Sequence, residues 1–311
     1  MKALAVDIGG SHISCAAVED RELLQICSVE ADSQGSLASV LPALLQTLSE
    51  LKKQHGGNFV GMGFGFCGLV DGRLRRVVST NAKYPDAASV DLVDWARKDL
   101  ELPLALENDA RLALLGERYA GAAQGSDDVV MMTLGTGIGT AAVMCGRPVR
   151  GKHFQAGCLG GHFTISAGGR LCSCGARGCF EAEASTYALP DVCRKWPGFE
   201  TSALATEPKL DFETLFYCAE LGDSVSKEIR ARSIGIWAAC ALSLVHAYDP
   251  ELLVVGGGVM KTSYPILDAL QKHLDSYAWT PWGKVRVRAA ALGSNAALLG
   301  AVPLLYEQNE I

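Results

Sequence analysis

The sequence has no long apolar run, no leader-like start and no excess of positive charge. No stretch of about 18 uninterrupted apolar residues occurs, so no segment is expected to span a bilayer. The N-terminus reaches Asp7 after only four apolar residues, too few for the core of a secretory leader, and we expect a cytoplasmic protein. Lys and Arg number 28 against 34 Asp and Glu, without a dense basic run. This balance does not favour nucleic acid or an anionic membrane as a partner.

The sequence also lacks the paired cysteine spacing of a disulfide framework. There are 11 cysteines, an odd number, and most are scattered singly through apolar or helical sequence. Disulfide frameworks belong to short secreted chains, so these scattered thiols are expected to be inert core residues. They are Cys15, Cys27, Cys67, Cys145, Cys193, Cys218 and Cys240.

The composition predicts a globular protein with a sizeable core. The chain has 311 residues, 49% of them hydrophobic and 20% charged, which allows two domains or one large one. Strand-like runs alternate with helical segments, and this order predicts an α/β fold. Apolar residues at helical spacing predict helices over residues 36–54 and 211–248. A strand over Val60–Phe66 alternates with glycine, which predicts close approach of another backbone.

A strand, a glycine turn with a hydroxyl residue and a second strand occur twice. The first copy is built around Gly9, Gly10 and Ser11, and the second, from residue 129 to 145, around Gly135, Thr136 and Gly137. Glycine-exposed amides with a hydroxyl can hold phosphate oxygens, although a single such turn is often only a hairpin. Neither turn is a Walker A loop or a Rossmann fingerprint. The two turns together with a third run, Gly256, Gly257 and Gly258, favour a nucleotide, and the repeat suggests two related halves.

The segment Glu107-Asn108-Asp109 lies where a predicted strand ends and a predicted helix, Asn108–Ala120, begins. A carboxylate at such a point can accept a proton from a hydroxyl that attacks a phosphoryl group. The same residues are also good helix caps. Both interpretations can hold at once, with Asn108 as the cap and Asp109 as the base.

A cysteine and histidine cluster predicts a metal. His162, Cys172, Cys174 and Cys179 form the pattern H-x9-C-x-C-x4-C. Three thiolates and one imidazole complete the tetrahedral shell of a structural Zn²⁺, and zinc is preferred over disulfides in a reducing compartment.

These motifs, taken in order, resemble the ROK family of bacterial sugar kinases and sugar-responsive repressors. The resemblance runs from residue 3 to about residue 302. It is carried by Asp7-Ile8-Gly9-Gly10-Ser11, Glu107-Asn108-Asp109-Ala110, Leu134 to Gly139, the cysteine and histidine run, Asp249-Pro250 with Val255 to Val259, and Gly293 to Gly300.

The resemblance implies an actin-like ATPase, ribonuclease-H-like fold of two α/β domains around a central cleft. The smaller domain is expected to span residues 1–118, joined by a C-terminal segment of about 293–311, and the larger one residues 119–292. The smaller domain would hold the first phosphate loop and the catalytic Asp. The larger one would hold the second phosphate loop, the zinc motif and the third glycine run.

The resemblance also implies roles for single residues. Gly9, Gly10 and Ser11 match the first phosphate loop, Gly135, Thr136 and Gly137 the second, and Gly256, Gly257 and Gly258 the adenosine side. Asp7 matches the family's Mg²⁺-associated carboxylate and Asp109 its general base. Residues that match sugar-contacting positions are Asn81, Asn108, Asp109, His162 and Glu181.

Two departures from the family pattern affect charge and specificity. The family usually has Lys after its first glycine pair and the following hydroxyl residue, whereas this chain has Ser11-His12. The family's A-G-E-apolar-G-H here becomes Ala156-Gly157-Cys158-Leu159-Gly160-Gly161-His162, so a sugar-contacting Glu is replaced near Cys158 and one residue is added. A carboxylate that pairs with two hydroxyls is a strong specificity element, so the preferred sugar is expected to differ.

The favoured function is an ATP- and Mg²⁺-dependent kinase acting on a hexose or amino sugar, with a structural Zn²⁺. The alternative is a non-catalytic sugar-binding regulator. Repressors of the family carry a helix-turn-helix before the first phosphate loop, and only six residues precede Asp7 here. A dehydrogenase is disfavoured because no G-x-G-x-x-G stands between a strand and a helix. The resemblance implies a homo-oligomer, a dimer or a tetramer.

Overall fold

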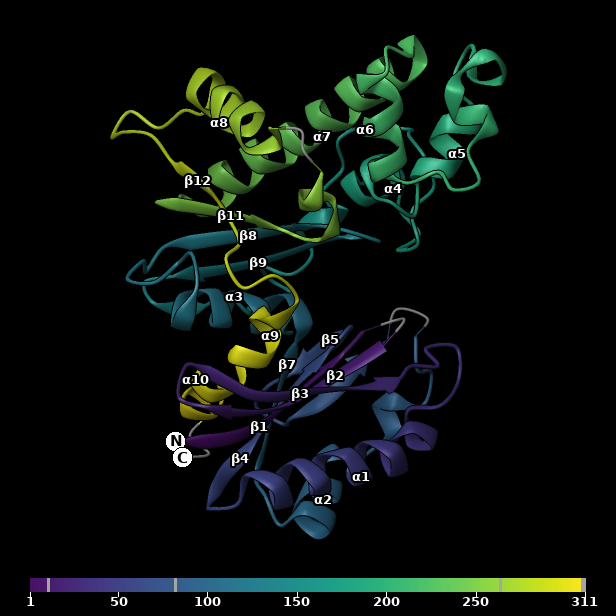
Figure 1. Cartoon of the computed structure of the whole chain (residues 1–311). Helices are drawn as coiled ribbons and strands as arrows, with labels where there is room; N and C mark the ends of the chain where they lie inside the picture. Colours follow the sequence, from purple (N-terminus) through teal and green to yellow (C-terminus); the bar gives the residue numbers. More distant parts are fainter. Residues whose placement is uncertain (10–11, 81–82, 263–264, 309–311) are drawn as a thin grey trace. The chain divides into compact units, whose positions relative to one another are not determined.

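The chain forms two compact α/β units, seen in a computed structural model (Figure 1). The first unit comprises Met1–Gly125, Val149–Ala156 and Ala291–Ile311, and the second comprises Ser126–Pro148 and Gly157–Ala290. The residues that the structure describes are 1–9, 12–80, 83–262 and 265–308. Within these residues, no helix is long and apolar enough to cross a membrane.

The first unit is built on a five-stranded sheet of order β3-β2-β1-β4-β7. β1, β2 and β3 pair antiparallel, and β4 and β7 add in parallel to β1. The carboxyl ends of β1, β4 and β7 therefore lie at one edge, where ligands of α/β sheets commonly bind. The strands are β1 (Lys2–Ile8), β2 (His12–Glu19), β3 (Glu22–Glu30), β4 (Phe59–Phe66) and β7 (Leu104–Asn108).

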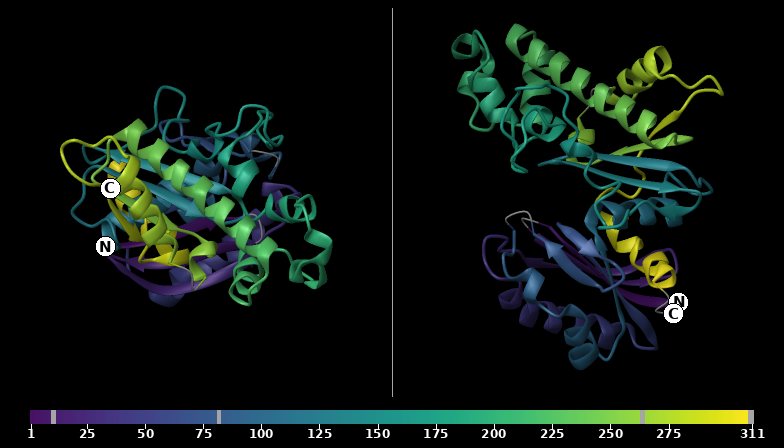
Figure 2. Two further views of the ribbon diagram at one scale, coloured as in Figure 1. Left: turned by 90° about the horizontal axis from the view of Figure 1, so that it is seen from above. Right: turned by 180° about the vertical axis from the view of Figure 1, so that it is seen from behind.

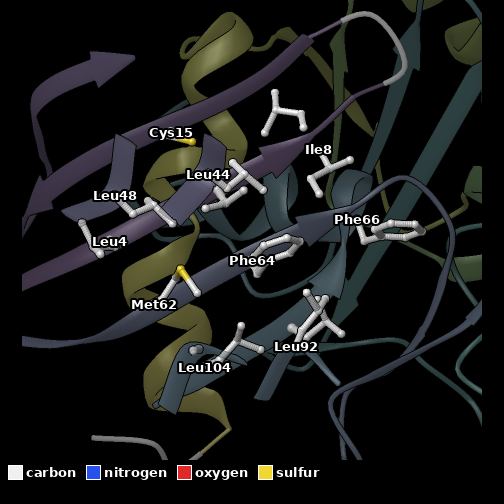
Figure 3. Packing of buried hydrophobic residues seen from close by; sticks show 14 of the residues in the cluster. Leu4, Ile8, Cys15, Leu44, Leu48, Met62, Phe64, Phe66, Leu92 and Leu104 are labelled. Carbon is white, nitrogen blue, oxygen red and sulfur yellow. The ribbon is translucent and has the colours of Figure 1, made fainter. Parts of the chain in front are cut away.

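Alternate residues of β1 point to opposite faces of this sheet, and helices cover both faces. Leu4, Val6 and Ile8 pack with α1 (Leu37–His55), as Figure 3 shows for Leu4, Ile8, Leu44 and Leu48. Ala3 and Ala5 face the other side, where the cluster includes residues of α3 (Asp109–Ala120), α9 (Ala296–Leu299) and α10 (Ala301–Glu307). Because both faces are buried, the strand reads as a continuous apolar run. The predicted helix over 36–54 is confirmed as α1.

The predicted close approach at the glycine-rich strand is confirmed. A Cβ on Gly63 of β4 would lie 2.5 Å from the Cα of Ala301 in α10. A Cβ on Gly116 of α3 would lie 1.9 Å from the carbonyl oxygen of Ala296 in α9. No other residue type fits where backbones pass this closely.

The second unit repeats the strand order of the first. Its sheet has the order β10-β9-β8-β11-β12, with β8, β9 and β10 antiparallel and β11 and β12 added in parallel to β8. The repeated strand-turn-strand pattern of the sequence thus marks the first hairpin of each sheet. The strands are β8 (Val129–Leu134), β9 (Ile138–Met144), β10 (Arg147–Pro148), β11 (Leu252–Gly256) and β12 (Arg286–Ala289).

Helices α7 (Ser224–Tyr248) and α8 (Ile266–Tyr277) lie on one side of this sheet (Figures 1 and 2). The prediction of one helix over 211–248 is wrong, because α6 (Phe212–Glu220) and α7 are separate helices. Gly222, with a φ of 105°, breaks the path, and Asp223 caps α7 by accepting a hydrogen bond from the amide of Ser226. A left-handed φ of this kind favours glycine.

The remaining elements are short. They are the hairpin β5 (Leu69–Asp71) and β6 (Arg76–Ser79), the helices α2 (Leu92–Trp95), α4 (Phe180–Ala184) and α5 (Leu189–Arg194), a π-helical turn at Ala96–Leu100, and 3-10 turns at Ala87–Ser89, Gly160–His162, Phe199–Thr201, Ala203–Thr206, Gly258–Lys261 and Gly293–Asn295.

Candidate active site

Asp109 opens α3 at the carboxyl end of β7, at the point where the sequence predicts a base. Its Oδ1 accepts hydrogen bonds from Asn108 Nδ2 and from the amide of Ala110, both at 2.8 Å. Among the described residues, Oδ2 of Asp109 accepts none. Burial raises the pKa of Asp109, against the lowering effects of the Ala110 amide, Lys83 and Asn108. One oxygen is held in place and the other is left to accept a proton.

Asn108 fulfils the capping half of the prediction. Its Oδ1 accepts a hydrogen bond from the amide of Arg111 at 3.2 Å, which caps α3. Its Nδ2 also donates to the carbonyl of Gly68 at 3.1 Å. The helix cap is therefore Asn108, and the carboxylate of Asp109 is not needed to cap α3.

Asp7 lies near the end of β1, and its carboxylate is electrostatically coupled to Asp109. Burial, and to a smaller degree repulsion from Asp109, raise the pKa of Asp7 to about 7. Its Oδ1 is buried and accepts no hydrogen bond from any described residue. A buried carboxylate oxygen without a partner fits a cation ligand, because leaving it unpaired is costly.

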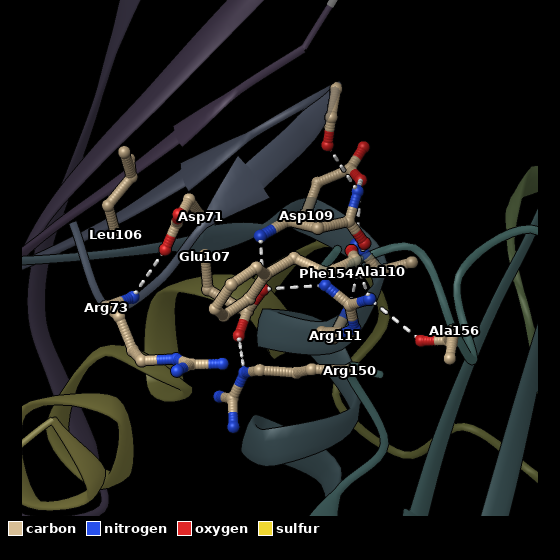
Figure 4. Close-up of polar contacts among 12 residues, drawn as sticks. Asp71, Arg73, Leu106, Glu107, Asp109, Ala110, Arg111, Arg150, Phe154 and Ala156 are labelled. Carbon is tan, nitrogen blue, oxygen red and sulfur yellow. Dashed lines mark hydrogen bonds and ion pairs between the residues drawn. The ribbon is translucent and has the colours of Figure 1, made fainter. Parts of the chain in front are cut away.

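A buried ion network is centred on Glu107, the residue that precedes the Asn108-Asp109 turn (Figure 4). Glu107, fully buried, accepts hydrogen bonds from Arg111 at 3.0 Å and from Arg150 at 2.7 Å. Arg111 also donates to the carbonyl oxygens of Phe154 and Ala156, both at 2.8 Å. This network is not apparent from the sequence, since Arg150 is far from Glu107 along the chain. The local signal was the spacing of Glu107 and Arg111, which stand four residues apart across the end of β7 and the start of α3.

The first glycine turn is described only at Gly9. Its amide donates to the carbonyl of His12 at 3.2 Å, and a Cβ there would lie 2.9 Å from that oxygen. Gly10 and Ser11, and the predicted sugar contact Asn81, lie outside the described residues.

The second glycine turn joins β8 to β9 and is backed by the segment around α4. The carbonyls of Gly135 and Thr136 accept hydrogen bonds from the amides of Thr186 and Tyr187, both at 3.0 Å. Glu181 Oε2 accepts from the amide of Ile138 at 3.2 Å, and a Cβ on Gly137 would lie 2.4 Å from that oxygen. Glu181 therefore lies against the second phosphate-loop candidate, a contact that is not apparent from the sequence.

The third glycine run lies beside the second turn within the same unit. Gly256 pairs with Thr133 in the sheet. Gly257 has a φ of 96°, and a Cβ there would lie 2.2 Å from the carbonyl oxygen of Leu134. A Cβ on Gly258 would meet no described atom within 4 Å. The structure thus brings together two of the three glycine segments that are predicted to bind a nucleotide.

The predicted zinc ligands converge. One ligand atom from each of His162, Cys172, Cys174 and Cys179 lies within 4.8 Å of the others. The Sγ atoms of Cys174 and Cys179 are 3.7 Å apart, and Sγ of Cys172 is 3.5 Å from Nδ1 of His162. Tetrahedral Zn–S bonds of about 2.3 Å would separate two sulfurs by about 3.8 Å. The cluster fits Zn²⁺, and the ring nitrogen of His162 that lies beside the Cys172 thiol is Nδ1.

The segment with the altered family motif is packed on β9. The hydroxyl of Thr140 donates to the carbonyl of Gly157 and accepts from the amide of Gly160, both at 2.8 Å. A Cβ on Gly161 would lie 2.0 Å from the carbonyl oxygen of Ile138. The glycine pair before His162 is therefore required by close packing.

Comparison with known proteins assigns the family. The model of the ROK family matches residues 3–308. The chain belongs to the ROK family. The resemblance found in the sequence is thereby confirmed over nearly the whole chain.

Among ROK proteins, the glucokinase of Thermotoga maritima is 31% identical over 99% of this chain and 98% of its own length. The xylose repressor of Bacillus subtilis is 24% identical over 98% of this chain and 77% of its own length. The structure of a ROK family glucokinase from Streptomyces griseus, in complex with glucose and AMPPNP, superposes with a TM-score of 0.81. It is 28% identical and covers 99% of this chain and 100% of its own. The α/β, actin-like ATPase fold that the resemblance implied is confirmed.

Proposed function

We propose that this ROK protein is an ATP-dependent kinase that phosphorylates a hydroxyl of a hexose or amino sugar, with Asp109 as the general base. The observation that carries the proposal is the Asp109 carboxylate, whose Oδ1 accepts two hydrogen bonds while Oδ2 accepts none from the residues that the structure describes. A general base has to lie within hydrogen-bond reach of the attacking hydroxyl and needs a pKa suited to the working pH. The raised pKa of Asp109 supports this role. The glucokinases among its relatives support a sugar as the acceptor.

The other candidate residues receive roles consistent with their surroundings. The first glycine turn, Gly9 to Ser11, and the second, Gly135 to Gly137, would hold phosphates through backbone amides. Gly256 to Gly258 would lie on the adenosine side. Asn108, His162 and Glu181 would contact sugar hydroxyls, together with Asn81.

Two metal ions belong to the proposal. Asp7 would hold Mg²⁺ that arrives with ATP, and such an ion neutralises charge on the phosphates during transfer. His162 and the three cysteines would hold Zn²⁺ with a structural role, because all four ligand positions come from protein. The residues of this chain would orient the sugar through Asn108 and receive its hydroxyl proton at Asp109.

The test is a coupled assay for ADP release from ATP across hexoses, N-acetylhexosamines, ketoses and rarer sugars. The kinase proposal expects saturable, sugar-dependent ADP release that is lost in Asp109→Asn. Size-exclusion chromatography with light scattering would test the expected dimer or tetramer.

The second candidate is a sugar-binding regulator without catalysis, favoured by the similarity to the xylose repressor. It predicts that a sugar binds, as measured by calorimetry, while no sugar in the panel supports ADP release. Sugar-dependent ADP release by the wild-type protein would exclude it.

A further inference from the structure

Cys15 and Cys27 belong to the scattered cysteines that the sequence predicts to be inert, but the sheet of the first unit pairs them. Cys15 of β2 and Cys27 of β3 stand directly opposite each other in the antiparallel register of these strands. Side chains of directly opposed residues lie on the same face of a sheet. Cys15 lies in the core cluster under α1, with Leu44 and Leu48, and Cys27 packs against the same cluster (Figure 3). Two thiols that are separated along the chain are therefore neighbours in the fold.

The spacing of opposed residues suits a disulfide that forms and breaks. Their Cα atoms lie about 4.5 or 5.5 Å apart in an antiparallel pair, and a disulfide spans Cα separations of about 4.4–6.8 Å. Their Cβ atoms lie about 4.5–5.5 Å apart, whereas a disulfide favours about 3.5–4.5 Å. Both residues are free thiols in the structure. Linking them would draw the strands together slightly, and a bond strained in this way is easily reduced again.

The two thiols differ in access. Cys15 is fully buried, and burial, with a smaller contribution from Cys27, raises its pKa to about 12. Cys27 is only half-buried and lies on β3, the edge strand of the sheet. Nε2 of Gln25 donates to Sγ of Cys27 at 3.7 Å, and Oε1 of Gln25 lies 2.9 Å from Nε2 of His55 at the end of α1. A small oxidant therefore reaches Cys27 first, with Cys15 behind it as the second thiol.

We propose that Cys15 and Cys27 form a redox-sensitive dithiol, which a hydroperoxide converts into a reversible disulfide between β2 and β3. In the first step, the sulfur of Cys27 attacks a peroxide oxygen, the O–O bond breaks, and Cys27 becomes a sulfenic acid as water or an alcohol leaves. In the second step, the sulfur of Cys15 attacks the sulfenic sulfur, the S–O bond breaks, and hydroxide leaves with the Cys15 proton as water.

The balance of this reaction is that two thiols lose two electrons and the hydroperoxide gains them. An external dithiol restores both thiols by thiol–disulfide exchange. The dithiol does not depend on the proposed kinase function, so its test needs neither sugar nor ATP.

The first test treats the wild-type protein with hydrogen peroxide, blocks the remaining thiols with iodoacetamide and analyses tryptic peptides by mass spectrometry. Cleavage after Arg21 separates Cys15 from Cys27, so their disulfide appears as two linked peptides. Most of the oxidised Cys27 should be found in this linked pair, and dithiothreitol should release it. Oxidised Cys27 that is mainly a sulfinic acid, or is mainly linked to another cysteine, would overturn the proposal.

The second test separates the roles of the two thiols. Cys15→Ala keeps a small apolar side chain in the core and removes the second thiol, so sulfinic acid at Cys27 should increase by about 10-fold. Cys27→Ala should leave Cys15 reduced, because Cys15 is fully buried. Cys145→Ser replaces an exposed thiol elsewhere and should leave the linked pair at its wild-type yield.

Two results of the second test would also contradict the proposal. One is an unchanged amount of sulfinic acid at Cys27 in Cys15→Ala, and the other is oxidation of Cys15 at the wild-type rate in Cys27→Ala. Circular dichroism and Tm of each variant show whether it is folded. The wild-type measurement requires no variant, so it decides the proposal even where a variant is unstable.

Discussion

Both hydrogen bonds that Asp109 makes with described residues are accepted by Oδ1, so replacing only the other oxygen should remove the base with little disturbance. In Asp109→Asn, the retained Oδ1 still accepts from Asn108 and Ala110, whereas the amide cannot take up a proton. We expect kcat to fall by about 10²–10⁴-fold, the usual contribution of a general base. Sugar binding, measured by calorimetry or by the shift in Tm, should change far less.

Asp99→Asn is the matched control, because Asp99 is an exposed carboxylate on a helical turn of the same unit. It should leave kcat unchanged. Near-wild-type turnover in Asp109→Asn would leave Asp109 with a structural role only. The pKa of Asp109 is raised above that of an ordinary carboxyl group. As the pH falls, wild-type activity should therefore be lost at a higher pH than an ordinary carboxylate base would give.

Single residues were predictable where the chemistry is local in sequence. Asn108 and Asp109 stand together at a strand-to-helix junction, so the cap and the carboxylate were both assigned from the sequence. The zinc ligands span less than 20 residues and could be grouped by spacing. Arg150 gave no such signal, because its partner Glu107 is brought near only by the folded sheet.

At the scale of elements, the start of α7 depends on one carboxylate. Asp223 accepts hydrogen bonds from the amides of Ser226 and Ala203 and from the hydroxyl of Ser202, at 2.7, 3.1 and 2.8 Å. Burial raises the pKa of Asp223, but these hydrogen bonds outweigh it and lower the value to about 2. The ionised side chain therefore stabilises the fold above the unfolded-state pKa, near 4. That contribution is lost as the pH falls from about 4 to about 2.

Asp223→Ala should cost about 1 kcal/mol of unfolding free energy at pH 7 and lower Tm by a few degrees. Urea unfolding monitored by circular dichroism would measure the difference in unfolding free energy between Asp223→Ala and the wild type. This difference should be present at pH 7 and disappear toward pH 2. Asp223→Asn keeps a capping oxygen without a titrating group, so it should lose less stability at pH 7. Asp268→Ala, which removes an exposed carboxylate in the first turn of α8, should be near neutral. Equal losses in Asp223→Ala and Asp268→Ala would refute the cap.

In the cysteine and histidine cluster, loss of one ligand should lower both the metal content and the stability of the protein. Cys174→Ser removes one of four ligands, so bound zinc by elemental analysis should fall and Tm should drop, because a structural metal contributes directly to folding. Apparent sugar affinity should weaken as well, since Glu181 accepts a hydrogen bond from Ser173, which stands between two of the ligands.

Cys145→Ser replaces another exposed thiol, outside the cluster, and should change neither zinc content nor Tm. Wild-type protein that contains no zinc and is fully active would contradict the metal assignment.

Helix boundaries followed the sequence pattern where apolar spacing and stop signals agree. α1 ends at His55, before Gly56 and Gly57, as the glycine pair predicts. The break between α6 and α7 was missed because apolar residues continue on both sides of Gly222, so periodicity alone joined the two helices. The decisive local signal was the Gly-Asp pair, which combines a left-handed residue with a cap.

At the scale of the whole molecule, the internal repeat predicted two related halves, and the two sheets share their strand order. Periodicity did not reveal that residues 149–156 belong to the first unit. That segment has no regular apolar spacing, and it is held there by Arg150 with Glu107 and by the bonds from Arg111 to Phe154 and Ala156. Such long-range ion pairs leave no periodic trace in a sequence.

The intact protein should not prefer glucose, although relatives of this chain are glucokinases. The segment around Cys158 carries a thiol where the family resemblance expects a carboxylate, and a thiol is a weak hydrogen-bond partner for sugar hydroxyls. A site of paired polar groups discriminates by about 10⁴-fold or more, and a less polar one by about 10²-fold or less. We therefore expect a panel of hexoses and N-acetylhexosamines to show another sugar ahead of glucose, or several sugars within about 10²-fold in kcat/KM.

Cys158→Glu tests whether the thiol of Cys158 is the reason for the low preference for glucose. A restored carboxylate should raise kcat/KM for glucose relative to the other sugars of the panel. Cys145→Ser serves again as the distant thiol control and should leave the ranking unchanged. Glu181→Ala should lower kcat/KM for every sugar, since the family resemblance gives Glu181 a position that contacts sugar hydroxyls. It also frees the Ile138 amide beside the second glycine turn, so KM for ATP should rise as well. A wild-type preference for glucose by a wide margin would show that Cys158 does not stand in the place of the missing carboxylate.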